Sequence, residues 1–372
     1  VTGTTLVSGT LDLDEGAGAN HSFGALTIEG VFSASAATTT INGNFLNNGT
    51  FTDNEGTVKL DHGSSTYVYN DGGGTDTTFY NLTVTGTSAS YRMDDDFTVE
   101  NTLTVQSNRF MLGCDSGGGH SNIIATIGTT SAAGTVAIET SGELEFYGND
   151  DSTYSELKGA STVLSAVVSG AGNIDFGTGL ECRLADLEIG PIGGLTTFTI
   201  ADNELVKLTG DVKWQGLTVE GELDLSGQRM VTSGLLTISG DNGLKNTTDG
   251  STQDTVAHLI CNGILASTTT HHASLSNVVY LADGGNAHKI EYFDFGTFVA
   301  IRAGAVDMGR YGPDSASMNV IAANTTNLQN WGRTGSVGNA NSMNNLTIAT
   351  GTTVLPESAT LTVAGDFTTS GG

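Results

Sequence analysis

Short segments of alternating apolar and polar residues recur along this chain of 372 residues. Each segment has leucine, then threonine or glutamate, then isoleucine or valine. In an extended strand the two apolar side chains point to one face and the polar one to the other. The copies begin at Leu26, Leu82, Leu103, Leu187, Leu217, Leu236, Leu346 and Leu361. The alternation predicts many short strands, each with one buried face.

The intervals between these segments also repeat. Phe97 and then Leu103 follow Leu82 at the same two intervals at which Leu361 and then Phe367 follow Leu346. The interval from Leu103 to Leu187 is four times the interval from Leu82 to Leu103. No helical pattern lies between the strands. The repeat therefore predicts an all-β fold, a right-handed parallel β-helix (β-solenoid) with coils of about 20 residues.

We expect one continuous solenoid over residues 1–372, with coils of differing regularity. The regular stretches are 1–110, 184–242 and 344–372; the coils of 111–183 are looser, and those of 243–343 are degenerate, with longer loops and an aromatic cluster. The chain opens and closes within the repeat and has no polar cap. We therefore expect uncapped solenoid ends, which either continue into flanking segments of a longer array or are covered by neighbouring copies.

Composition and charge narrow the class of protein. With 52 glycines, 3 prolines and 37% hydrophobic residues, the chain is typical of a globular β-rich protein with many tight turns. The formal net charge of −27 argues against nucleic acid as a partner, because binding to phosphates needs a basic surface. No apolar run approaches the ~18 residues of a membrane-spanning helix, so we expect no membrane insertion.

The cysteines indicate neither a zinc site nor a disulfide framework. Cys114, Cys182 and Cys261 lie much too far apart in the sequence to match a zinc ligand set, and an odd number cannot all pair within one chain. We interpret them as free residues in the solenoid wall.

One acidic cluster is a candidate calcium site. Asp94 and Asp96 flank Asp95, and in an extended strand these two carboxylates would share a side. The corresponding stretch near the C-terminus, 357–360, lacks the triplet, so the repeat itself does not require it. A solvated corner loop is the alternative interpretation, and we expect no other cofactor.

A second acidic group is a candidate glycan site. Glu143 and Glu145 alternate with apolar residues, so both carboxylates are predicted to line one outer face, with Asp151 nearby. Paired carboxylates are the groups that glycoside hydrolysis uses. Because the sequence does not give their separation, we predict no enzyme and keep glycan contact as the functional alternative.

Aromatic residues gather in the degenerate stretch and form the other candidate contact surface. Exposed aromatic rings stack on sugars and anchor protein interfaces. The residues concerned are Tyr280, Tyr292, Tyr311 and Trp331. The alternative is that they fill a wider section of the core.

Several phrases give the chain a family resemblance. They are Asn81-Leu82-Thr83-Val84, Asn345-Leu346-Thr347-Ile348, Gly365-Asp366-Phe367-Thr368 and Gly9-Thr10-Leu11-Asp12-Leu13. In these phrases the sequence resembles the parallel β-helix stalks of large bacterial surface adhesins and of phage virion fibre or tail proteins. The resemblance covers the three regular stretches, and it is one of repeat style. It implies an extracellular, cell-surface or virion-surface structural role and carries over no catalytic residue.

The sequence therefore favours a non-enzymatic structural element, such as a fibre, stalk or surface-layer component, which assembles or extends through its uncapped ends. Two alternatives stay open. The first is a tailspike-like β-helix that binds or cleaves a surface glycan, and the second is a self-polymerising filament subunit.

Overall fold

The computed structural model describes most of residues 1–232 and, beyond them, mainly the backbone of separate strands. The described residues are 1–13, 18–63, 67–70, 76–87, 90–113, 122–146, 154–161, 166–177, 181–192, 197–226, 228–232, 236–238, 244–245, 258–261, 265–267, 274–275, 278–281, 287–289, 294–295, 298–302, 305–307, 319–323, 327–329, 342–343, 345–350, 362–363 and 366–369. They group into two compact units, Val1–Leu195 and Thr196–Gly372.

All regular elements that the structure describes in the first unit are strands. They are β1 (Thr5–Val7), β2 (Thr10–Asp12), β3 (His21–Phe23), β4 (Leu26–Ile28), β5 (Val31–Ser33), β6 (Thr38–Ile41), β7 (Phe45–Asn47), β8 (Thr50–Thr52), β9 (Thr57–His62), β10 (Tyr67–Asn70), β11 (Thr77–Gly86), β12 (Ser90–Met93), β13 (Phe97–Leu112), β14 (Ile123–Ile127), β15 (Gly134–Phe146), β16 (Tyr154–Gly159), β17 (Ala166–Gly170), β18 (Asn173–Asp175), β19 (Glu181–Ala185) and β20 (Leu187–Ile192).

The described elements of the second unit are also strands. They are β21 (Phe198–Ile200), β22 (Leu205–Leu208), β23 (Val212–Trp214), β24 (Leu217–Val219), β25 (Glu222–Asp224), β26 (Arg229–Thr232), β27 (Leu236–Ile238), β28 (Leu244–Lys245), β29 (His258–Cys261), β30 (Leu265–Ser267), β31 (Ser274–Leu275), β32 (Val278–Leu281), β33 (Ala287–Lys289), β34 (Asp294–Phe295), β35 (Phe298–Arg302), β36 (Ala305–Asp307), β37 (Asn319–Ala323), β38 (Asn327–Gln329), β39 (Ser342–Met343), β40 (Asn345–Thr350), β41 (Thr362–Val363) and β42 (Phe367–Thr369).

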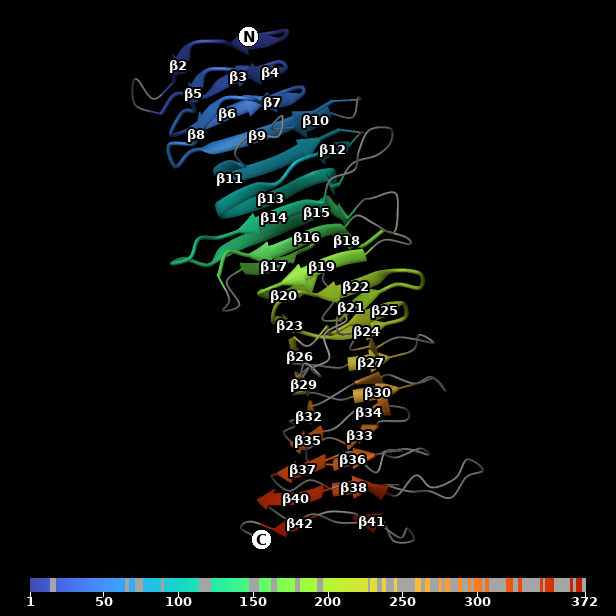
Figure 1. The fold of residues 1–372 in the computed structure, drawn as a ribbon. Coiled ribbons are helices and arrows are strands. Elements are labelled where there is room, and N and C mark those ends of the chain that lie inside the picture. The colour runs from blue at the N-terminus through green and yellow to red at the C-terminus, as the bar shows by residue number, and fades with distance from the viewer. Residues whose placement is uncertain are drawn as a thin grey trace. The chain divides into compact units, whose positions relative to one another are not determined.

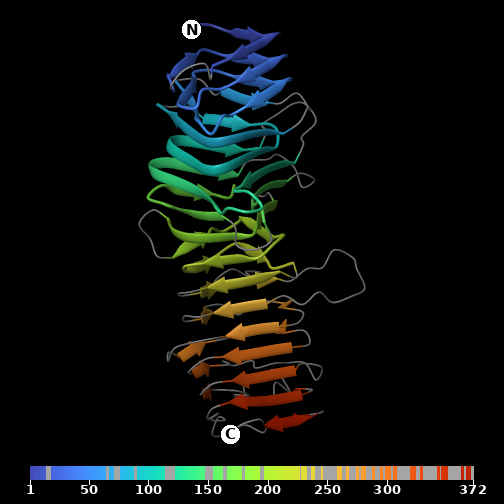
Figure 2. The ribbon, with the colours of Figure 1, turned by 90° about the vertical axis from the view of Figure 1, so that its left-hand side faces the viewer.

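Strands of successive coils pair in parallel within each unit (Figure 1). The turned view in Figure 2 shows the same stacking of coil on coil. The described residues contain no helix, and hence none long and apolar enough to span a membrane. The prediction of an all-β parallel β-helix is therefore confirmed, while its handedness stays a prediction.

The stacking register explains the repeated phrase. Leu26 pairs with Thr5 of the coil before it and with Phe45 of the next coil, and both steps are close to the predicted period. Leu82 pairs directly with Leu103, the first residue of the next copy of the phrase. In these two copies each apolar position stacks on its counterpart, because Val84 also pairs with Val105.

The same rule holds in the second unit. Leu217 pairs with Leu236 and Thr218 with Thr237, so two copies of the phrase lie directly on one another. The β21–β24–β27–β30 ladder continues this column on both sides.

Coil length varies more than the regular period predicted. Phe110 pairs with Tyr91 after a step close to that period, but it pairs with Leu144 after a much longer one. Between Leu103 and Leu187 the coils depart from a constant period. The ladder passes from Leu103 to Val136, then to Val168 in β17, and β17 pairs with β20, which contains Leu187. The steps from Leu103 to Val136 and from Val136 to Val168 are each much longer than the predicted period, and the register shifts between Val105 and Ser107 and between Val168 and Gly170.

Aromatic side chains form a continuous column inside the first unit. Phe45, Tyr69, Phe79, Phe97 and Phe110 are all buried. Neighbouring ring centroids lie 5.5 Å apart for Phe45 and Tyr69 and 6.0 Å apart for Phe97 and Phe110. These distances lie within the range in which aromatic pairs add stability beyond the area they bury.

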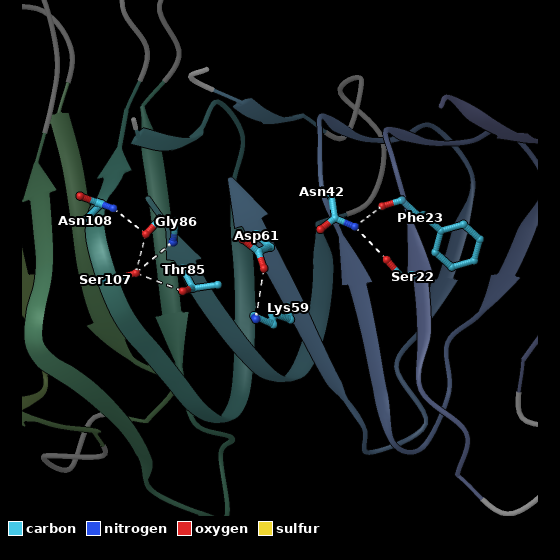
Figure 3. A network of polar contacts seen from close by, with 9 residues as sticks. All are labelled: Ser22, Phe23, Asn42, Lys59, Asp61, Thr85, Gly86, Ser107 and Asn108. Carbon is cyan, nitrogen blue, oxygen red and sulfur yellow. Dashed lines mark hydrogen bonds and ion pairs between the residues drawn. The ribbon is translucent and has the colours of Figure 1, made fainter. Parts of the chain in front are cut away.

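Polar side chains cover one outer face of this unit and bond from coil to coil. Asn42 donates hydrogen bonds to Ser22 Oγ at 2.8 Å and to the Phe23 carbonyl at 2.7 Å (Figure 3). Farther along, Ser107 Oγ accepts a bond from the Gly86 amide at 3.0 Å and donates one to its carbonyl at 2.8 Å. These bonds satisfy backbone groups where strands end and the chain turns.

Candidate functional site

The acidic group on β15 is positioned by simple strand alternation. Leu144 and Phe146 are buried, so the side chains between and before them, Glu145 and Glu143, lie on the opposite side of the strand. The prediction that both carboxylates share one outer face agrees with this geometry.

Arg109 bridges these two glutamates. It stands directly opposite Glu143 in the register of β13 with β15. Its Nε lies 3.3 Å from Glu143 Oε2, and its Nη1 lies 3.3 Å from Glu145 Oε2. The single guanidinium therefore holds both carboxylates and offsets the repulsion between them. No sequence pattern pointed to this arginine, which lies in the preceding coil at an unusually long interval from the two glutamates.

The next coil extends the polar column. Asn173 pairs with Glu143 and Asp175 with Glu145 in the register of β15 with β18. Asn173 Nδ2 donates a hydrogen bond to Glu143 Oε1 at 3.1 Å. The Asp175 carboxylate accepts one from the Gly177 amide at 2.8 Å. Three successive coils thus contribute to one outward cluster, hereafter the Arg109 cluster: Arg109, Glu143, Glu145, Asn173 and Asp175.

Glu145 is the unusual member of the Arg109 cluster. Its side chain is buried, and burial raises the pKa of the carboxyl above its ordinary value. The charge of Arg109 lowers this pKa, whereas the charges of Asp175 and Glu143 raise it further. The contact between Arg109 and Glu145 Oε2 is an ion pair without hydrogen-bond geometry. A raised pKa of this kind is what a general acid requires, although here a guanidinium contacts both carboxylates.

The remaining predicted contact residues do not join this cluster in the part of the chain that the structure describes. Asp151, Tyr292, Tyr311 and Trp331 lie outside the described residues, and of Tyr280 only the backbone in β32 is described. Their proposed contact with a glycan or a protein stays a prediction.

The candidate calcium ligands have structural partners. Asp94 Oδ1 forms an ion pair with Arg92 Nε at 3.0 Å. Asp96 Oδ1 accepts a hydrogen bond from the backbone amide of Ile124, in the next coil, at 2.7 Å. Among the described residues, no group of three or more His, Cys, Asp or Glu side chains is arranged to hold a metal ion. These contacts favour the corner-loop interpretation, in which the carboxylates fasten the connection between β12 and β13.

One cysteine can be placed in full. Cys182 of β19 is buried and is not in a disulfide, and its Sγ donates to the Phe176 carbonyl at 2.7 Å. This agrees with the interpretation of a cysteine in the solenoid wall. Only the backbone of Cys261 is described, and Cys114 lies outside the described residues.

The comparisons add no relative. No protein-family model, no curated protein and no solved structure matches this chain.

Proposed function

We propose that this chain is a non-enzymatic structural element of an extracellular, cell or virion surface: a section of a fibre, stalk or surface layer. The observation that carries the proposal is the parallel register that passes from coil to coil within each unit. In such an array each coil contacts only its neighbours, and resistance to unfolding grows by adding coils.

The outer residues support the same role. One outward column of the first unit runs through Thr57, Asn81, Thr102 and Thr135 in register. Hydroxyl and amide side chains keep such a face hydrated, and the net charge of −27 opposes lateral aggregation. In the Arg109 cluster one guanidinium pairs with two carboxylates of the next coil, which suits a stabilising contact between coils better than catalysis.

We further propose that the partners are flanking segments or further copies of the same array, which meet it at the terminal coils. The edge strand of a β-ladder presents N–H and C=O groups that can template another strand. Leu6 in β1 is 57% exposed and Phe367 in β42 is 59% exposed, so both terminal strands carry apolar surface that a partner would cover.

Electron microscopy of the purified chain across a dilution series tests this assembly. We expect end-to-end association that increases with concentration and is lost in a Phe367→Lys, Thr368→Pro double variant, because proline removes a ladder donor. Thr368→Ser is the matched control and should assemble like the wild type. Single particles of constant size at every concentration would contradict assembly through the ends, and filaments that persist in the double variant would place the contact elsewhere.

A glycan-binding or glycan-cleaving β-helix is the second candidate function. The observation that favours it is the buried Glu145 carboxyl, with its raised pKa, beside Glu143 on one outer face. Incubation with a panel of surface polysaccharides, followed by reducing-end analysis, tests this function. Cleavage that disappears in both Glu143→Gln and Glu145→Gln would replace the structural proposal, whereas an inactive wild type would support it.

A further inference from the structure

His62 occupies an inward position that the alternation of β9 would ordinarily give to an aliphatic residue. Val58, Leu60 and His62 form the buried side of this strand, and His62 is 0% exposed. It is the last residue of the strand. The position is therefore part of the packed interior and also lies at a strand end.

A glycine in the next coil makes room for the imidazole. His62 pairs with Gly86 in the register of β9 with β11. A Cβ built on Gly86 would lie 2.1 Å from His62 Cε1 and 2.2 Å from Nδ1. The ring therefore lies directly against the Gly86 backbone, and any larger residue at position 86 would displace it.

The buried ring has no polar compensation. Neither Nδ1 nor Nε2 of His62 has a hydrogen-bond partner among the described residues. Among the described residues, the ring of Tyr91 is its aromatic neighbour, with centroids 6.4 Å apart, and the Tyr91 hydroxyl donates to the Gly43 carbonyl. The Tyr91 hydroxyl therefore forms no hydrogen bond with the imidazole. Burial of a polar group without a hydrogen bond is costly, and burial of its charged form is costlier still.

The charged groups around His62 offer little to an imidazolium. On its own strand, Asp61 points to the outer face, where Lys59 Nζ pairs with its carboxylate at 3.2 Å (Figure 3). Asp61 raises the pKa of His62, but desolvation by burial is the larger effect, and the pKa is lowered from its ordinary value of 6.5. The neutral ring is thus the form that fits the folded state.

The neighbouring strands bring no carboxylate to the ring. β6 contains no titratable residue, and the titratable residue of β11 is Tyr80, at a half-buried outer position. β12 contributes Tyr91 and also Arg92, whose guanidinium pairs with Asp94 at 3.0 Å. A protonated His62 would therefore lie in an apolar environment, and its N–H groups would have no hydrogen-bond acceptor among the described residues.

We propose that His62 makes the C-terminal end of β9 acid-labile where it stacks on β11: below neutral pH, protonation is relieved by local opening of the His62–Gly86 stack, which releases the ring to water. The hydrogen bonds around this stack indicate which side of it would open. The Thr87 amide donates to the His62 carbonyl at 3.1 Å and would lose its acceptor. Gly86 is held from the other side by Ser107 and Asn108, so opening would begin on the His62 side.

The sign of the effect follows from linkage. Because burial lowers the pKa of the folded form, the opened form binds a proton more readily. The closed form is then most stable relative to the opened form above pH 6.5, the ordinary pKa of histidine. This relative stability decreases as the pH falls below that value. While the buried ring stays neutral, the opening equilibrium grows by a factor that approaches about tenfold per pH unit.

Hydrogen exchange of the full-length chain, normalised for the intrinsic pH dependence of amide exchange, tests the proposal. We expect the protection of the Thr87 amide to fall severalfold between pH 7 and pH 5.5 in the wild type, and to stay constant in His62→Leu. The matched control is His21→Leu in β3, which removes a half-buried histidine from another coil and should retain the loss of protection. A wild type whose Thr87 protection is independent of pH, or a loss that persists in His62→Leu, would overturn the proposal.

A second measurement does not require the variant to fold like the wild type. Ring-labelled histidine in the wild-type chain reports each imidazole by its Cε1 resonance during a pH titration. We expect the His62 resonance to stay in the neutral form as the pH falls through 6.5, and to exchange with an opened form below that value. A simple titration with a midpoint near the ordinary value, without line broadening or any change at Thr87, would mean that the folded end of β9 accommodates the charge and that no opening occurs.

Discussion

Phe79 provides the sharpest test of the aromatic column, because it lies at the column's centre. Its side chain is fully buried. Its ring centroid lies 5.6 Å from that of Phe51, 6.0 Å from Tyr69, 6.1 Å from Phe45 and 6.5 Å from Phe97. Replacement of Phe79 by alanine therefore removes one ring from four aromatic pairs and leaves a cavity between coils.

The expected loss of stability follows from these contacts. Phe→Ala in a packed core costs about 3–5 kcal/mol in the free energy of unfolding. With four ring neighbours and no solvent exposure, Phe79→Ala should fall in the upper half of this range, about 4 kcal/mol. Phe79→Leu keeps most of the buried volume but loses the aromatic pairing, so it should cost about 1.5 kcal/mol.

Urea titration followed by far-UV circular dichroism measures these differences, from the shift in midpoint at constant slope. The matched control is Thr83→Ala, on the outward side of the same strand β11, which should change stability by no more than about 0.5 kcal/mol. Hydrogen exchange would add the location of the damage, because a one-dimensional array loses protection first near the altered coil. Equal midpoint shifts for Phe79→Ala and Thr83→Ala would refute the view that the aromatic column holds these coils together.

Three further outcomes are expected. Burial raises the pKa of Glu145, so this carboxyl contributes stability that is present below its ordinary pKa of 4.5 and is lost as the pH rises through the folded-state pKa. Glu145→Gln should therefore flatten the dependence of the urea midpoint on pH between 4 and 8. An unchanged slope would contradict this expectation. Gly142→Ala would place a Cβ 2.2 Å from the Val105 carbonyl oxygen, so thermal unfolding should show a loss of about 2 kcal/mol or more. Tyr91→Phe removes the donor to the Gly43 carbonyl at 3.1 Å and should cost about 1 kcal/mol by urea titration, while a neutral result would mean that the carbonyl finds another partner.

The fold could be predicted from the sequence because the repeated phrase encodes the stacking directly. Leu82 and Leu103 begin successive copies of the phrase in the sequence, and they are direct partners in the ladder. Local alternation also places Glu143 and Glu145 on one side of β15 without any knowledge of the neighbouring coils. Both predictions depend on strand geometry alone, which is a short-range property.

Contacts between coils of unequal length could not be predicted in this way. Arg109 meets Glu143 because a long coil separates them, and nothing in the period of about 20 residues points to that pairing. The space for His62 depends on Gly86 in the following coil, and a single glycine in a chain with 52 of them is not a signal. The register between coils determines both sites, and the sequence specifies that register only where the phrase is regular.

The tolerance of the ladder for coils of different length has an evolutionary consequence. Phe110 stacks on Tyr91 across a short coil and on Leu144 across a much longer one, and all three remain buried. The longer coil therefore keeps these three positions buried, and closing a longer loop costs little, about 0.6 kcal/mol for each doubling of its length. Selection could diversify what the corners display while the ladders beneath them stay constant. The same corners are suitable points at which to graft a foreign peptide onto the scaffold.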